Sequence, residues 1–244
     1  MAFLLTFVAG FVDIVGYIAV YHLFTAHMTG ATAHLGHDLI TGRYVEAVFA
    51  LSVLAGFVLG SIGGRAVIEA GARGHVRSVA SITIAIEAAL LLGFVAAFNL
   101  LSGTGESPAG IGLLLTLLAV AMGIQTASLT RIGPLTVHTT FVTGMLNKLA
   151  QLISHFLFRS YDLIRAGEHD VQRLRKMRKQ HFQETLFFFL IWSTYCIAAL
   201  AGTFCYLRWN IRVMYLPAVL LGIVIVVDQF RPLSLQEEED QVEL

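Results

Sequence analysis

Long apolar runs separated by short polar stretches organise almost the whole chain. Six of these runs approach or reach the roughly 20 residues that a helix needs to cross a bilayer. They are residues 2–23, 45–63, 79–101, 109–129, 185–207 and 213–227. The last run is short for a crossing, so we expect its helix to continue past Asp228. The pattern predicts an all-α membrane protein with about six transmembrane helices.

Composition excludes an ordinary soluble domain. Hydrophobic residues make up 57% of the 244 residues and charged residues only 13%, against about 45–50% and about 25% in soluble domains. The 16 basic and 16 acidic residues cancel, but they are segregated along the chain. Residues 159–181 are strongly basic and residues 237–240 are acidic. A basic stretch beside membrane spans is expected on the cytoplasmic side, so it does not indicate nucleic-acid binding.

The chain reads as two related halves, because residues 9–40 resemble residues 121–154. Residues 25–30 align with residues 139–144 through a shared T-x-x-x-T-G core, and allowing two extra residues in the second copy also places Asp13 over Gln125. We interpret this as a duplication, although apolar helices also resemble one another by chance. The predicted organisation is a first repeat at 1–101, an external linker at 102–108, a second repeat at 109–230 containing a basic cytoplasmic loop at 159–183, and an acidic cytoplasmic tail at 231–244.

Four short motifs carry a resemblance to a known family. The stretches G-F-V-D, A-H-M-T-G-A-T, M-G-I-Q and T-T-F-V-T-G, together with the span pattern over about residues 3–230, resemble the YoaK family of bacterial membrane proteins. Two features depart from that pattern: Ala31 stands where asparagine is expected, and the basic loop 159–183 is longer than usual. The resemblance implies a six-span protein of the bacterial inner membrane and brings no established activity.

Charge decides between two topologies for the Thr-Gly segments, residues 24–41 and 138–158. If both segments cross the membrane there are eight crossings; if both dip in and return there are six. The basic loops at 64–78 and 159–183 should both be cytoplasmic, and only six crossings place them on one face. We therefore predict six crossings, cytoplasmic termini, and two inverted three-helix repeats, each with a short broken or re-entrant Thr-Gly segment. Such segments are tolerated only where protein or water surrounds them, as in many transporters.

Ionisable residues inside spans are the strongest candidates for chemistry. Asp13 lies in the middle of the first span and Glu87 inside the third. Charged groups at such depth cost roughly 2.5–3.5 kcal/mol on insertion scales and normally face a polar interior. We interpret Asp13 as a candidate proton or cation site, with a structural hydrogen-bonded aspartate as the alternative. Glu87 is the second candidate, and Gln125 is the neutral counterpart of Asp13.

The Thr-Gly pairs are the other candidate ligands. Gly30 and Gly144 would permit a tight backbone at a helix break, and Thr29 and Thr143 could satisfy freed backbone groups or cap a short helix. The alternative is that they are ordinary caps that bind nothing. We expect Thr29, Thr143 and Gln125 to lie near Asp13.

Small residues predict close helix packing. Ser52, Gly56, Gly60 and Gly64 recur every four residues, and Ala119, Gly123 and Ala127 repeat the pattern. Such faces let helices approach closely. The histidines near residues 27–37 lack further acidic or cysteine ligands, so we predict no metal site.

Together these features favour a small secondary transporter of an unidentified solute or ion, with proton coupling as an open alternative. A non-transporting membrane scaffold or partner subunit, and a channel, are the alternatives. We expect no enzyme activity, since no nucleophile elbow or nucleotide-binding fingerprint is present, and no cofactor. The expected partners are a small solute or ion and the lipid bilayer, and a homo-oligomer stays open.

Overall fold

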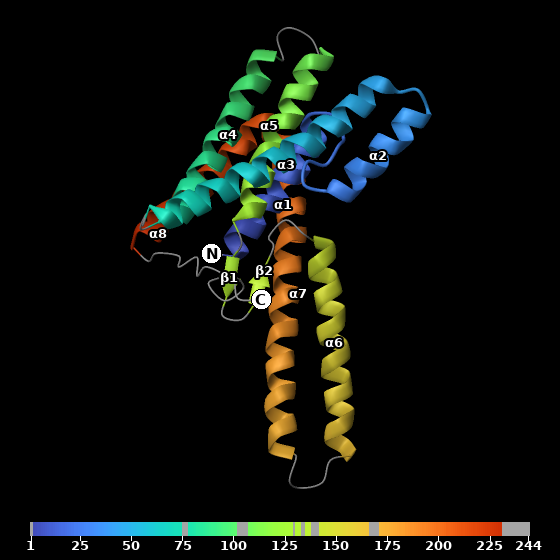
Figure 1. Ribbon diagram of the computed structural model, residues 1–244, viewed down its shortest axis with the longest axis vertical. Coiled ribbons are helices and arrows are strands. Elements are labelled where there is room, and N and C mark those ends of the chain that lie inside the picture. Colours follow the sequence, from blue (N-terminus) through green and yellow to red (C-terminus); the bar gives the residue numbers. More distant parts are fainter. Residues whose placement is uncertain are drawn as a thin grey trace.

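The computed structural model describes most of the chain as helix (Figure 1). The described residues are 2–74, 78–101, 107–128, 130–132, 135–137, 142–165 and 171–230. The helices are α1 (Ala2–Ala19), α2 (Met28–Ile40), α3 (Tyr44–Arg73), α4 (Val79–Leu101), α5 (Pro108–Ala127), α6 (Val142–Arg165), α7 (Val171–Trp209) and α8 (Tyr215–Phe230), with a 3₁₀ helix, η1 (Asn210–Met214), between the last two. Two three-residue strands, β1 (Thr130–Ile132) and β2 (Leu135–Val137), pair antiparallel. This small hairpin is a departure from the all-helical prediction.

Five stretches are long and apolar enough to cross a membrane: α1, α3, α4, α5 and His181–Phe230. The last contains 50 residues, and at a rise of about 1.5 Å per residue it would be more than twice as long as a bilayer core of about 30 Å. It is broken at Asn210, whose φ of 53° ends α7. The last apolar run is helical through Phe230, so the predicted extension past Asp228 is confirmed.

The two Thr-Gly segments form helices of different length. The first is a turn followed by α2, which has 13 residues and is too short to span a bilayer. The first span also ends earlier than predicted, at Ala19, and the chain turns at His22, which has a φ of 52°. The second segment continues as the 24-residue α6. Residues 138–141 of that segment, residues 102–106 of the predicted linker and the predicted tail 231–244 lie outside the described residues.

The prediction of a loop at 159–183 was wrong. The described residues there are the end of α6 and the start of α7, which together form a long helical hairpin extending away from the other helices (Figure 1). Lys, Arg, Gln and Leu all favour helix, so the basic character of this stretch does not require an irregular loop. α6 packs on α7 through Met145 and Leu152 against Phe188 and Ile191.

The predicted small-residue stripes are confirmed as packing faces. A Cβ atom added at Gly60 would lie 2.2 Å from the carbonyl oxygen of Val120, and one added at Gly123 would lie 2.3 Å from that of Phe57. α3 and α5 therefore approach backbone to backbone, and the Ser61 hydroxyl donates to the Gly123 carbonyl at 3.2 Å across the contact. α7 packs on α1 as α3 packs on α5.

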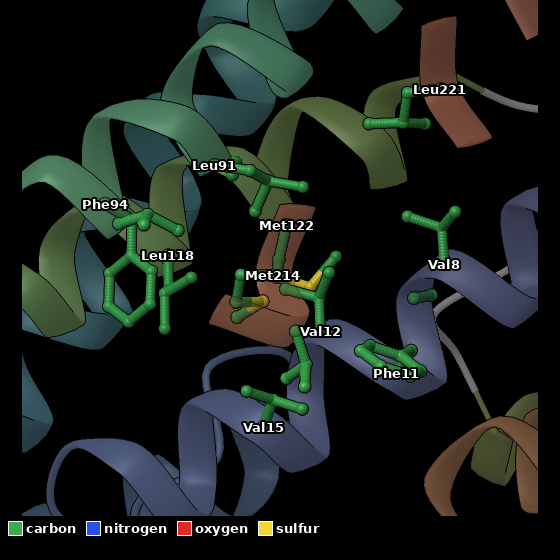
Figure 2. Close-up of a cluster of buried hydrophobic side chains, with 14 of the residues drawn as sticks. Val8, Phe11, Val12, Val15, Leu91, Phe94, Leu118, Met122, Met214 and Leu221 are labelled. Carbon is green, nitrogen blue, oxygen red and sulfur yellow. The ribbon is translucent and has the colours of Figure 1, made fainter. Parts of the chain in front are cut away.

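The main hydrophobic core lies among α1, α4, α5, η1 and α8 (Figure 2). Phe11, Phe94, Leu118 and Met122 are fully buried in it. The outward faces of the helices are also apolar: Leu59 is 63% exposed and Leu200 is 73% exposed. Large apolar residues exposed over several helices are expected where lipid, not water, surrounds the protein.

Candidate functional site

Asp13 is buried in the middle of α1 and joins three parts of the chain. Its Oδ1 accepts hydrogen bonds from the backbone amides of Thr25 and Ala26, both at 3.1 Å, in the turn before α2. Its Oδ2 accepts one from the Tyr195 hydroxyl of α7 at 2.9 Å. Asp13 is only 1% exposed. The carboxylate therefore ties α1 both to the first Thr-Gly segment and to α7.

His27 gives this buried group a connection to the surface. Its Nε2 lies 3.6 Å from Asp13 Oδ2, and its side chain is 38% exposed. An aromatic stack holds the ring in place: Tyr17 stacks on Phe24 at 4.3 Å between ring centroids, and Phe24 contacts His27 at 4.5 Å. The ring therefore places a polar group between the buried carboxylate and the surface.

The Thr-Gly pairs are at matching positions of two helices. Thr29 and Gly30 are the second and third residues of α2, and Thr143 and Gly144 are the second and third residues of α6. Both glycines are helical and neither has a positive φ, so neither forms the tight break that the sequence suggested. Thr29, Gly30 and Thr143 are exposed and Gly144 is half-buried. Asp13 is therefore bonded by residues just before the pair and not by the pair itself.

Gln125 is buried near the end of α5, but it does not lie beside Asp13 along α1. Its Nε2 donates to the carbonyl of Leu5 at 2.9 Å, and Leu5 precedes Asp13 by about two helical turns. Its Oε1 has no hydrogen-bond partner within the described part of the chain, and the same is true of the Thr6 hydroxyl on the neighbouring residue of α1. The expected cluster of Asp13 with Gln125 is therefore not what the structure forms.

Glu87 belongs to the region of Gln125. The hydroxyl of Ser128, the residue that caps the end of α5, donates to Thr83 of α4 at 3.1 Å. Since α4 and α5 are antiparallel neighbours (Figure 1), one turn further along α4 places Glu87 at the level of Gln125. Glu87 is 1% exposed, and its Oε1 has no hydrogen-bond partner among the described residues. Buried polar atoms are normally hydrogen-bonded, so an atom of this kind requires a specific explanation.

Sequence reasoning found Asp13 but missed its partners. Tyr195 lies inside an apolar run and reads as a packing residue, and backbone amides such as those of Thr25 and Ala26 carry no sequence signal at all. The aromatic Tyr17 and Phe24 around His27 were the available hint. Among the described residues, no group of three or more His, Cys, Asp or Glu side chains could hold a metal ion.

The helices, their apolar outer faces and the buried carboxyl groups define a multi-pass transmembrane protein. The chain belongs to the family described as "Protein of unknown function (DUF1275)", which it matches over residues 1–227. It is similar to the UPF0700 transmembrane protein YoaK of Bacillus subtilis (strain 168), with 27% identity over 223 residues, covering 89% of this chain and 88% of that protein. The resemblance seen in the sequence is thereby confirmed. No solved structure matches significantly.

Proposed function

We propose that this protein is a proton-coupled secondary transporter of a small solute or ion, built from two inverted repeats. The observation that carries the proposal is the buried Asp13, which holds the turn before α2 on one side and Tyr195 of α7 on the other. A single proton at this carboxylate would alter contacts between both halves of the molecule. Ionisable residues within membrane spans are by default associated with ion or substrate pathways.

The packing of the helices supports two repeats, 1–101 and 109–230. In this assignment α1 to α4 correspond in order to α5 to α8. α3 packs on α5 and its counterpart α7 packs on α1, while α2 packs on α3 and its counterpart α6 packs on α7. In Figure 1, α1 runs upward and α5 downward, α3 downward and α7 upward, α4 upward and α8 downward. Opposite directions for corresponding helices favour an inverted repeat.

Six crossings follow from this assignment: α1, α3, α4, α5, the second half of α7, and α8. In Figure 1 the start of α1 and the ends of α3 and α8 lie at the left near mid-height, on the side away from the α4–α5 connection at the top, and the α6–α7 hairpin extends below them. Both basic stretches are thus at the end where we place the cytoplasm.

The first prediction concerns this topology. A reporter inserted between Leu101 and Ser107 should read as external, and one inserted between Arg165 and Val171 should read as cytoplasmic. Paired phosphatase and fluorescent-protein fusions would measure this in intact bacterial cells. A fusion after Phe230 serves as the control and should match the α6–α7 insertion. Equal signals from the first two sites would rule out six crossings.

Protonation of Asp13 offers a simple coupling step. Ionised, the carboxylate accepts bonds from the Thr25 and Ala26 amides and from Tyr195. Protonated, it becomes a weaker acceptor, and its hold on the turn before α2 and on α7 loosens. The titratable groups that face Asp13 from the described residues are His27 in the turn and Tyr195 on α7. Of the two, His27 is the one that reaches the surface, with its side chain 38% exposed.

The second prediction tests transport directly. Purified protein in vesicles that contain a trapped pH-sensitive dye should acidify or alkalinise the lumen when one of a panel of solutes is added outside. The panel should include amino acids, carboxylates, and monovalent and divalent cations, each tested with and without a proton ionophore. Protein-free vesicles are the control. A proton flux that depends on one solute class supports the proposal, whereas no response to any class contradicts proton coupling.

A partner subunit without transport is the second candidate function. It is favoured by the full set of hydrogen bonds around Asp13, which suits a structural residue, and by the α6–α7 hairpin, which extends well past the other helices (Figure 1). The hairpin exposes Leu157 and Phe158 of α6, at 59% and 68%. Two results together would favour this function. No solute in the transport panel would produce a proton flux, and a stable complex with another protein would be lost when this hairpin is shortened.

A further inference from the structure

We propose that a groove at the junction of α4, α7 and η1 binds a phosphate-type anion. The groove has a volume of about 740 Å³. Asn99 at the end of α4 contributes to its polar lining. The other polar and amphipathic lining residues lie within residues 206–212, around the break between α7 and η1: Tyr206, Arg208, Trp209, Asn210 and Arg212. None of these residues takes part in the Asp13 site, so this site is independent of the proposed transport mechanism.

The two arginines carry the chemical argument. Both Arg208 and Arg212 line the groove and both are exposed. Neither has an ion-pair partner among the residues that the structure describes. Arg43, which the predicted topology places on the same face, differs, because its guanidinium lies 2.6 Å from Asp38. A guanidinium presents a planar fork of donors that matches a phosphate oxygen pair, so two unpaired forks in one groove favour a phosphate-type ligand.

Position in the membrane strengthens the argument. In the proposed topology the face holding Arg208 and Arg212 is external, where Lys and Arg are disfavoured. Most basic residues of the chain are assigned to the other face, and Arg43 is already paired. The two exceptions, which have no acidic partner within the described part of the chain, therefore converge on a single groove. If these arginines only anchored the protein at the membrane–water interface, they would be expected at scattered positions around the external face. Their position in one groove is not explained by such anchoring.

The backbone is arranged to bring these side chains together. α7 ends at Trp209, and Asn210 has a φ of 53°, a left-handed conformation that asparagine tolerates better than most residues. The Asn210 side chain accepts a hydrogen bond from the backbone amide of Ile211 at 2.7 Å, which fixes the turn. The 3₁₀ helix that follows places Arg212 in the groove that Arg208 of the last turn of α7 also lines. Strained backbone of this kind is retained chiefly where surrounding structure or function requires it.

The rest of the lining indicates how the ligand is held. Trp209 is 59% exposed, and with Tyr206 it provides amphipathic rings of the kind that are enriched at the headgroup level of membranes. Asn99 and Asn210 offer amide groups for ester or hydroxyl oxygens. A phosphodiester of a lipid headgroup and a free phosphate would both satisfy the arginines, and the experiment below separates these two sources.

Binding can be measured on the intact protein in neutral detergent. The readout is the melting temperature over a titration of inorganic phosphate, of short-chain phosphatidylglycerol, and of short-chain phosphatidylcholine. We expect at least one of the first two to raise the melting temperature, and the double variant Arg208→Gln, Arg212→Gln to bind that ligand at least tenfold more weakly. Stabilisation by phosphatidylglycerol alone assigns the site to a lipid headgroup, and stabilisation by phosphate as well assigns it to a free anion.

Two further variants make the result decisive. Arg43→Gln removes a paired arginine assigned to the same face and should leave the titrations unchanged. Arg208→Lys with Arg212→Lys keeps both charges but removes the forks, and it should bind more weakly than the parent protein even if the glutamine variant does not fold. The proposal is overturned if neither anion stabilises the parent, if the lysine variant binds as the parent does, or if Arg43→Gln produces the same loss.

Discussion

Replacing Asp13 by asparagine is expected to abolish proton-coupled solute movement while leaving a folded protein in the membrane. The asparagine carbonyl can still accept from the amides of Thr25 and Ala26, which now bond Oδ1 at 3.1 Å. Its amide nitrogen cannot accept from Tyr195, which now donates to Oδ2 at 2.9 Å. We expect the lost bond to cost about 1–3 kcal/mol, partly offset by removal of a charge that the membrane interior disfavours. The dye-loaded vesicles described above would measure the loss of proton flux.

Two control variants test whether Asp13 carries a proton during transport or only holds the helices together. Asp38→Asn changes another buried carboxylate, one that pairs with Arg43 at the end of α2, and it should retain coupling. Tyr195→Phe removes the same hydrogen bond as Asp13→Asn but keeps the carboxyl group, so it should lose stability to a similar degree yet still move protons. If Asp13→Asn transports with the parent's pH dependence, Asp13 is structural and Glu87→Gln becomes the next test.

The spans could be predicted because their signal is local. The run 79–101 coincides with α4, and the small residues at Gly60 and Gly123 correctly indicated a close helix contact. Both predictions were possible because an apolar run or a regular spacing of small residues can be recognised from neighbouring positions in the sequence. The strongly charged 159–183 stretch was misjudged, because charge places a segment outside the bilayer but does not distinguish a loop from a helix.

The candidate site was only half predictable, for a different reason. A carboxylate in a span stands out, so Asp13 and Glu87 could be chosen from the sequence. Their surroundings depend on which helices cross and at what level. Tyr195 meets Asp13 only because α7 packs on α1, and Gln125 meets Leu5 only because of the level at which α5 passes α1. The Thr-Gly pairs were conspicuous as a repeated motif, yet a repeat identifies corresponding positions and does not show which atoms face a site.

The last prediction concerns the contact between α3 and α5. Gly60→Ala should strongly destabilise the protein, because the added Cβ would fall 2.2 Å from the Val120 carbonyl oxygen and 2.8 Å from its Cα. Both obstacles are backbone atoms that cannot rotate away, so α3 and α5 must separate. Overpacking of this kind typically costs about 1–3 kcal/mol, and occasionally more; here the obstruction places the expected cost at the upper end. Thermal unfolding of the purified protein, followed by light scattering and intrinsic fluorescence, would measure it.

Gly63→Ala is the matched control in the same helix. Gly63 is exposed, and among the described residues no heavy atom lies within 4 Å of the position that a Cβ would take, apart from those of its chain neighbours and of the backbone of its own helix. Alanine is the better helix former by about 1 kcal/mol in water, so this variant should be as stable as the parent or slightly more stable. If the two substitutions have equal effects, α3 and α5 do not meet at Gly60, and the corresponding packing of α7 on α1 loses its support as evidence for a repeat. A large loss for Gly60→Ala alone would show that backbone-to-backbone packing between the second half of α3 and the second half of α5 is a main source of stability, as expected if it joins the two proposed repeats.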